Sequence, residues 1–124
     1  DLSMSKTILI VEDNELNMRL FDQLLKSNGY DTIKSVDGSD AVDLAKDQNP
    51  DLIIMDIQLP GRSGLEITAD LKADNNLKHI PVVAVTAFAM KGDESKILEA
   101  GCDDYIAKPI SVPVFLDTVT KHLS

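Results

Sequence analysis

Residues 51–56 read DLIIMD, an apolar run that ends in a carboxylate. No polar side chain interrupts the run between Leu52 and Met55, which is typical of a parallel strand covered on both faces. Two further runs have the same character, TILIV at residues 7–11 and PVVAV at residues 81–85. Because such strands need helices on both faces of their sheet, the three runs predict an α/β domain.

Two weaker strands and five helices complete the predicted pattern. Residues 31–36 (DTIKSV) mix polar and apolar side chains and predict an edge strand, and residues 105–107 (YIA) predict a short fifth strand, also at an edge. Ser63 and Ser111 are suited to cap two of the helices, and Gly29 is suited to end the first. The apolar positions assigned to helix faces are Leu16, Leu20, Phe21, Leu24 and Leu25, then Ala41, Val42, Leu44 and Ala45, then Leu65, Ile67 and Leu71, then Ile97 and Leu98, and finally Phe115, Leu116, Val119 and Leu123.

Five strand–helix pairs in alternation predict the fold class. We expect a doubly wound, flavodoxin-like (βα)5 domain with a five-stranded parallel sheet. The three apolar strands belong at its centre and the polar-mixed second strand at its edge, so the predicted strand order is 2-1-3-4-5.

Length and composition limit the possible functions. The 124 residues are enough for one domain, and 44% of them are apolar, which indicates a globular chain. The formal charge of -9 argues against direct binding to nucleic acid or to an anionic membrane surface. The lone cysteine, Cys102, excludes an internal disulfide and fits a reducing cytoplasm, and no apolar run is long enough to span a membrane.

Polar side chains with complementary chemistry follow the predicted strands. Glu12 and Asp13 follow the first strand, Asp56 the third, Thr86 the fourth and Lys108 the fifth. The carboxyl ends of parallel strands lie at one edge of the sheet, where open α/β sheets bind their ligands. The pattern therefore predicts that three carboxylates, a hydroxyl and an ammonium group converge there.

This set of groups suits phosphoryl transfer. Clustered carboxylates repel one another unless a cation joins them, and Mg²⁺ prefers oxygen ligands and phosphoryl groups. Asp56 can then act as a nucleophile toward phosphorus. Lys108 and the cation can stabilise charge on the moving phosphoryl group, and Thr86 can donate a hydrogen bond to it.

Four short motifs carry a family resemblance. The stretches VEDN (11–14), MDIQLP (55–60), VTA (85–87) and KPI (108–110) resemble the CheY-like receiver domains of bacterial response regulators. The runs VEDNELN and AVTAFAMKGDE are most similar to the DivK group of single-domain regulators. The resemblance runs from about Thr7 to the end of the chain. We therefore expect a disordered or tag-derived start over residues 1–6 and one receiver domain over residues 7–124.

The resemblance implies a role for each site residue. Asp56 is the expected phosphoacceptor, Asp13 a direct Mg²⁺ ligand and Glu12 a ligand acting mainly through water, in a position where many members of the family have a second Asp. The backbone carbonyl of Gln58 is the expected further ligand, and Mn²⁺ can replace Mg²⁺. Lys108 is expected to bind the phosphoryl group, ahead of a cis bond to Pro109.

The resemblance also implies a switch. Thr86 is expected to move toward the phosphoryl group, after which the ring of Tyr105 turns inward.

The apolar residues after Thr86 suggest a partner surface. Phe88 and Met90 follow Thr86 in a predicted loop, where an exposed apolar patch would be unusual for a monomer. One hypothesis is that they help form a phosphorylation-sensitive partner surface, and the alternative is that they pack into the core.

The implied function is that of a response regulator in a phosphorelay. It would receive its phosphoryl group from the phosphohistidine of a sensor or hybrid histidine kinase or of a histidine phosphotransferase, and would control partner binding in the cell cycle or cell division. It would not be a turnover enzyme, although it could dephosphorylate itself. We expect a bacterial cytoplasmic protein, monomeric or weakly dimeric, that membrane-bound kinases can recruit and that binds no nucleic acid.

Plainer interpretations and competing functions remain open at this point. Asp13 alone could be a helix cap, Lys108 alone a solvated charge and Tyr105 alone an edge aromatic. A flavin mononucleotide protein would need a phosphate-binding loop in place of the acidic residues after the first strand. An aspartyl phosphatase would need a titratable residue in place of Gln58. A receiver excised from a hybrid kinase, or a phosphorylation-independent pseudo-receiver, stays possible.

Overall fold

A computed structural model describes residues 6–59, 61–87 and 91–123 of the chain. The predictions for residues 1–5 and for Phe88 and Met90 therefore lie outside the described residues. Strands and helices alternate along the chain: β1 (Thr7–Val11), α1 (Glu15–Ser27), β2 (Asp31–Ser35), α2 (Ala41–Gln48), β3 (Leu52–Asp56), α3 (Gly64–Ala73), β4 (Val82–Thr86), α4 (Lys91–Glu99), β5 (Asp104–Ala107) and α5 (Val112–Leu123).

The five strands form one parallel sheet in the order β2-β1-β3-β4-β5, so the predicted fold class and strand order are confirmed. All residues of β3 and β4 are buried, whereas β2 and β5 lie at the two edges and are partly exposed. Their carboxyl ends, including Asp56 and Thr86, share one edge of the sheet as the sequence predicts.

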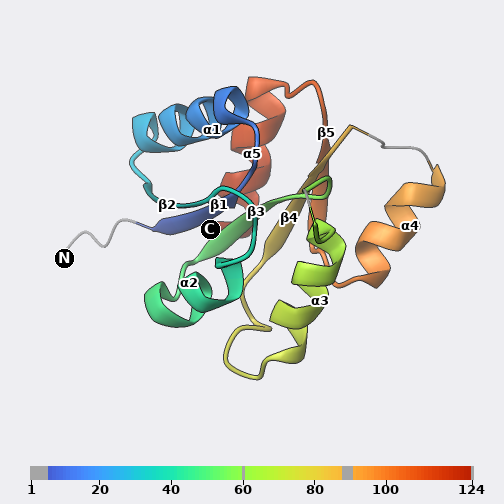
Figure 1. The fold of residues 1–124 in the computed structure, drawn as a ribbon. Coiled ribbons are helices and arrows are strands. Elements are labelled where there is room, and N and C mark those ends of the chain that lie inside the picture. The colour runs from blue at the N-terminus through green and yellow to red at the C-terminus, as the bar shows by residue number, and fades with distance from the viewer. Residues whose placement is uncertain (1–5, 60, 88–90, 124) are drawn as a thin grey trace.

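Alternate strand residues build two separate apolar layers. Leu9, Ile53 and Ala84 point to one face, which α2, α3 and α4 cover, and Ile54 and Val83 point to the other, which α1 and α5 cover. Figure 1 shows α1 and α5 together on one side of the sheet and α2 and α3 on the other. Because each face is covered by helices, the central strands can be apolar at every position.

Local sequence explains where several helices begin and end. The side chain of Asn14 accepts a hydrogen bond from the backbone N–H of Asn17 and caps α1, and Gly29 takes a φ of 87° just after α1 ends. Ser63 and Glu66 form a capping box at the start of α3. The predicted caps at Ser63 and end at Gly29 are thus confirmed, and Asn14 rather than Asp13 caps α1.

The predicted apolar faces of α1 and α4 were partly wrong. Leu16 and Leu20 are 73% and 37% exposed, and Leu98 on α4 is 51% exposed. The buried residues of α1 are Met18, Phe21 and Leu25. These three lie on one stripe of the helix, and Leu16 and Leu20 project from its flank. No helix in the described part of the chain is long and apolar enough to cross a membrane.

Candidate functional site

Three carboxylates meet at the carboxyl edge of the sheet. Glu12 and Asp13 follow β1, and Asp56 ends β3, its neighbour in the sheet. One carboxylate oxygen from each residue lies within 4.8 Å of the others. Glu12 and Asp56 are buried, and Asp13 is exposed. The structure therefore brings together the acidic residues that the sequence places at strand ends, with one open to solvent.

Lys108 supplies the positive charge on the buried side of this cluster. Its Nζ lies 3.4 Å from Oδ2 of Asp56 and 3.6 Å from Oε1 of Glu12, and its side chain is only 20% exposed. The backbone N–H of Lys108 donates to the carbonyl of Thr86, which ties the end of β5 to the end of β4. The bond from Lys108 to Pro109 is cis, as the family resemblance implies.

The two oxygens of Asp56 have different surroundings. Oδ1 accepts a hydrogen bond of 2.9 Å from the backbone N–H of Gln58, and Oδ2 faces Lys108. The Gln58 N–H was missed by sequence reasoning, because a backbone donor leaves no trace in residue type. Both contacts hold the carboxylate in one orientation.

Glu12 has a buried oxygen whose hydrogen-bonding capacity is unused. Its Oε2 accepts from the backbone N–H of Asn14 at 3.1 Å, whereas Oε1 has no hydrogen-bond partner among the described residues. Burial, followed by the neighbouring Asp56 carboxylate, raises the pKa of Glu12 to about 7, and the Asn14 N–H and Lys108 offset this only in part. The site thus favours additional positive charge beside Glu12.

A hard divalent cation fits these groups. All the ligand atoms are oxygens, one of them is buried without a hydrogen-bond partner among the described residues, and one belongs to a residue open to solvent, as expected for an ion that keeps several waters. Among the described residues this is the one acidic cluster with such geometry.

The two predicted switch residues lie on neighbouring strands of the sheet, Thr86 at the end of β4 and Tyr105 in the edge strand β5. Thr86 ends β4 and is buried, and it pairs in register with Ala107 of β5. Tyr105 is half-buried and packs against the core on the α2, α3 and α4 side. The Glu94 side chain of α4 lies beside its hydroxyl and raises the pKa of Tyr105.

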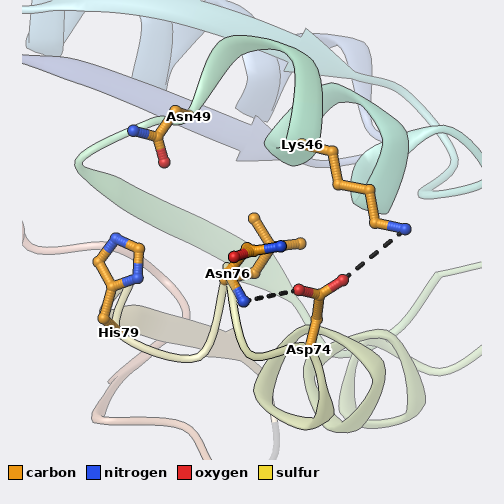
Figure 2. A pocket seen from close by; sticks show the side chains of 6 residues that line it. Lys46, Asn49, Asp74, Asn76 and His79 are labelled. Carbon is orange, nitrogen blue, oxygen red and sulfur yellow. Dashed lines mark hydrogen bonds and ion pairs between the residues drawn. The ribbon is translucent and has the colours of Figure 1, made fainter.

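Two hollows help to delimit the site. One of about 320 Å³ opens beside the carboxylates and is lined by Glu12, Asp13, Glu15, Met18 and Val36. Another, of about 600 Å³, lies between the end of α2 and the loop after α3, at the opposite edge of the sheet. Figure 2 shows that its side chains Lys46 and Asp74 already pair with each other. Nζ of Lys46 lies 3.7 Å from Oδ2 of Asp74. This second hollow contains none of the predicted site residues, so we place the function at the carboxylates.

Comparison with known proteins identifies the class of protein that this fold and site define. The response regulator receiver domain family matches residues 8–120, so the chain belongs to that family and is a receiver domain of two-component signalling. Within the family, the chain is 59% identical to the polar-differentiation response regulator DivK of Brucella ovis over 120 residues. That alignment covers 97% of this chain and 98% of the relative, and DivK of Brucella anthropi matches to the same extent.

Solved structures agree in fold. The receiver domain of the sensor histidine kinase PA1611 from Pseudomonas aeruginosa, 35% identical, superposes with a TM-score of 0.89 over 97% of this chain and 98% of that one. That structure has a magnesium ion coordinated in its active-site cleft. The chemotaxis protein CheY4 of Vibrio cholerae, 22% identical with a TM-score of 0.91 over 97% and 100% of the two chains, shares the fold.

Proposed function

We propose that this chain accepts a phosphoryl group on Asp56 from the phosphohistidine of a partner, with Mg²⁺ held by Glu12, Asp13, Asp56 and the backbone carbonyl of Gln58. The single observation that carries the proposal is the Asp56 carboxylate, buried at the sheet edge with Lys108 on one oxygen and two further acidic residues beside it. A carboxylate with a purely structural role would not need the two acidic neighbours.

The groups present suit each part of the transfer. An oxygen of Asp56 forms the new bond to phosphorus while the bond from phosphorus to the donor imidazole nitrogen breaks, and that nitrogen retains the electron pair and takes up a proton. Lys108 offsets charge on the phosphoryl oxygens, and Thr86 donates to one of them. When bound, Mg²⁺ neutralises part of the charge that the phosphoryl group and the three carboxylates bring together.

Phosphorylation would regulate the binding of partner proteins and would not regulate a catalytic activity of this chain. The alignment covers 98% of the DivK relative, so that protein consists of little beyond a receiver. Its name, polar-differentiation response regulator, supports a role in cell-cycle or cell-division control, which would take place in the bacterial cytoplasm. Histidine kinases, hybrid kinases or histidine phosphotransferases would be the partners, and Thr86 with Tyr105 would report the phosphoryl group to them. Autodephosphorylation would reset the protein without turnover of a substrate.

A phosphorylation-independent pseudo-receiver is the competing function. Such a module has no need for a partly buried lysine between two carboxylates, and Lys108 occupies that place. A buried Glu12 oxygen with no hydrogen-bond partner among the described residues would also be costly in a module that binds no cation.

Phosphorylation of the isolated protein tests the proposal. The protein is incubated with acetyl phosphate and Mg²⁺, and its intact mass is compared with that of an Asp56→Asn variant and of a sample in EDTA. We expect a single phosphate adduct on the wild type alone. If the wild type gains no adduct from acetyl phosphate or from a phosphorylated histidine phosphotransferase, the pseudo-receiver becomes the better description.

A further inference from the structure

The first residue of α3 lies directly against the backbone of Asp56. A β-carbon built on Gly64 would lie 2.1 Å from the carbonyl oxygen of Asp56 and 2.9 Å from its carbonyl carbon. It would also lie 2.9 Å from Cα of Ile57. All three neighbours are backbone atoms, which cannot rotate away as a side-chain end would. Any residue other than glycine at position 64 must therefore displace either α3 or the backbone that carries Asp56.

The backbone on the Asp56 side is tied to the site. The N–H of Ile57 donates to the carbonyl of Val85 in β4 at 3.1 Å, and the N–H of Gln58 donates to the Asp56 carboxylate at 2.9 Å. The N–H of Gly64 itself donates to the carbonyl of Ile57 at 3.0 Å. A displacement at Gly64 would thus reach the carboxylate of Asp56 and the backbone of Gln58 together.

The helix on the other side of the contact is also held in place. Ser63 and Glu66 close a capping box over the first turn of α3. The hydroxyl of Thr68, which is fully buried, donates to the carbonyl of Gly64 at 2.8 Å, and the thiol of Cys102 lies 3.8 Å from that hydroxyl. The first turn of α3 is therefore held by its own cap and by Thr68, whose hydroxyl contacts the turn before β5, and these contacts oppose a shift of the helix away from Asp56.

From this geometry we infer that Gly64 is a positioning residue for the phosphoryl site. Because Gly64 has no side chain, α3 can pack directly against the end of β3. This close packing determines the position of the Asp56 carboxylate and the Gln58 backbone relative to Lys108 and Glu12. This inference rests on the proposed function, because it concerns the geometry of Mg²⁺ binding and phosphoryl transfer.

The test compares two glycine variants from the same loop and helix start. Gly64→Ala places a methyl group against Asp56. Gly61→Ala is the matched control, because Gly61 has a φ of 83°, so alanine there is strained, yet its β-carbon would meet nothing within 4 Å. Both variants should lose stability, and only the first should disturb the site. For each we would measure the dissociation constant for Mg²⁺ and the rate of phosphorylation by acetyl phosphate at saturating Mg²⁺.

We expect Gly64→Ala to weaken Mg²⁺ binding and to slow phosphorylation by about tenfold or more each, since displacements near 1 Å at such centres have effects of that order or larger. Gly61→Ala should stay within about twofold of the wild type in both, because no reacting group moves. A folded Gly64→Ala variant that matches the wild type in both measurements would overturn the inference and leave the proposed function intact. A wild type that binds no Mg²⁺ and gains no phosphate would instead overturn the proposed function, and this inference with it.

If Gly64→Ala folds poorly, a second measurement separates a loss of stability from a change at the site. Trimethylamine N-oxide favours the compact state without supplying a missing contact. If the osmolyte restores the folded far-ultraviolet circular dichroism spectrum while Mg²⁺ affinity stays low, the positioning role is supported. Recovery of both together would show that Gly64 serves only stability, and the inference would fail.

Discussion

The ionisation of Glu12 should have the clearest effect on the pH dependence of stability in the metal-free protein. Burial and the Asp56 carboxylate raise its pKa from 4.5 to about 7. Between these values the folded state holds a proton that the unfolded state has released, so the free energy of unfolding must fall as pH rises. We predict a fall of up to about 1.4 kcal/mol per pH unit that is attributable to Glu12 and that levels off above pH 7.

Urea unfolding in EDTA at several pH values, compared with Glu12→Gln, would measure this contribution. Glutamine cannot titrate, so the difference in stability between wild type and variant isolates the one residue. Parallel pH profiles for the two proteins would show that Glu12 is ionised normally and that its buried oxygen has a partner. Saturating Mg²⁺ should flatten the wild-type profile, because the cation replaces the proton.

At the same scale, the convergence of the candidate site residues could be predicted from sequence but their fine geometry could not. Glu12, Asp56 and Lys108 converge because parallel strands end at one edge, a rule that needs only the strand assignments. The separate roles of the two Asp56 oxygens depend on a backbone N–H, and the contact at Gly64 depends on the approach angle of α3. Neither is encoded in residue type or spacing.

Among the elements, α1 and α5 are joined by an aromatic pair. The rings of Phe21 and Phe115 stack with centroids 5.2 Å apart, and both side chains are fully buried. We predict that Phe115→Ala lowers the free energy of unfolding by about 3–5 kcal/mol, from lost burial and the cavity left behind. Val114→Ala, one residue earlier on the exposed flank of α5, should change it by less than about 0.5 kcal/mol.

A double-mutant cycle in chemical unfolding tests whether the two helices are coupled through these rings. Phe21→Ala, Phe115→Ala and the double variant should show an interaction energy of about 0.5–1.5 kcal/mol. Strict additivity would mean that each ring packs against the sheet independently of the other.

The α3 helix is fastened to the loops that precede β4 and β5 by one lysine. Nζ of Lys72 donates to the carbonyl of Ile80 at 2.8 Å and to that of Lys78 at 3.2 Å, and pairs with Asp103 at 2.8 Å. Lys72→Met keeps the aliphatic stem and removes these contacts, so we predict a loss of about 1.5–3 kcal/mol in the free energy of unfolding. Lys78→Met, at an exposed position, is the control, and equal effects in thermal unfolding would contradict the prediction.

Elements were easier to predict than the faces they present. The strands were recognisable because burial on both sides requires unbroken apolar runs, and β3 is the clearest case. The face of α1 was misassigned at Leu16 and Leu20, since the six apolar residues among positions 16–25 satisfy more than one helical stripe. Packing against the sheet selects the stripe through Met18, Phe21 and Leu25, and sequence periodicity alone contains no information on that choice.

For the whole molecule, the acidic site and the net charge of -9 act in the same direction. Every carboxylate at the sheet edge adds to the repulsion that opposes the compact state, and a cation bound only by the folded protein relieves it. We predict that Mg²⁺ at about 100 times its dissociation constant raises the free energy of unfolding by about 2.7 kcal/mol. The gain should depend on Asp13, the carboxylate of the cluster that is open to solvent.

Asp13→Asn separates specific binding from charge screening in this experiment. Urea unfolding would be followed across a Mg²⁺ titration, with sodium chloride at matched ionic strength as the reference. Screening of the net charge should stabilise wild type and variant alike, because the Debye length falls with either salt. The additional stabilisation by Mg²⁺ should appear in the wild type and be lost in the variant. If the variant gains as much as the wild type, the cation acts on the overall charge of the molecule, and the carboxylate cluster does not bind it.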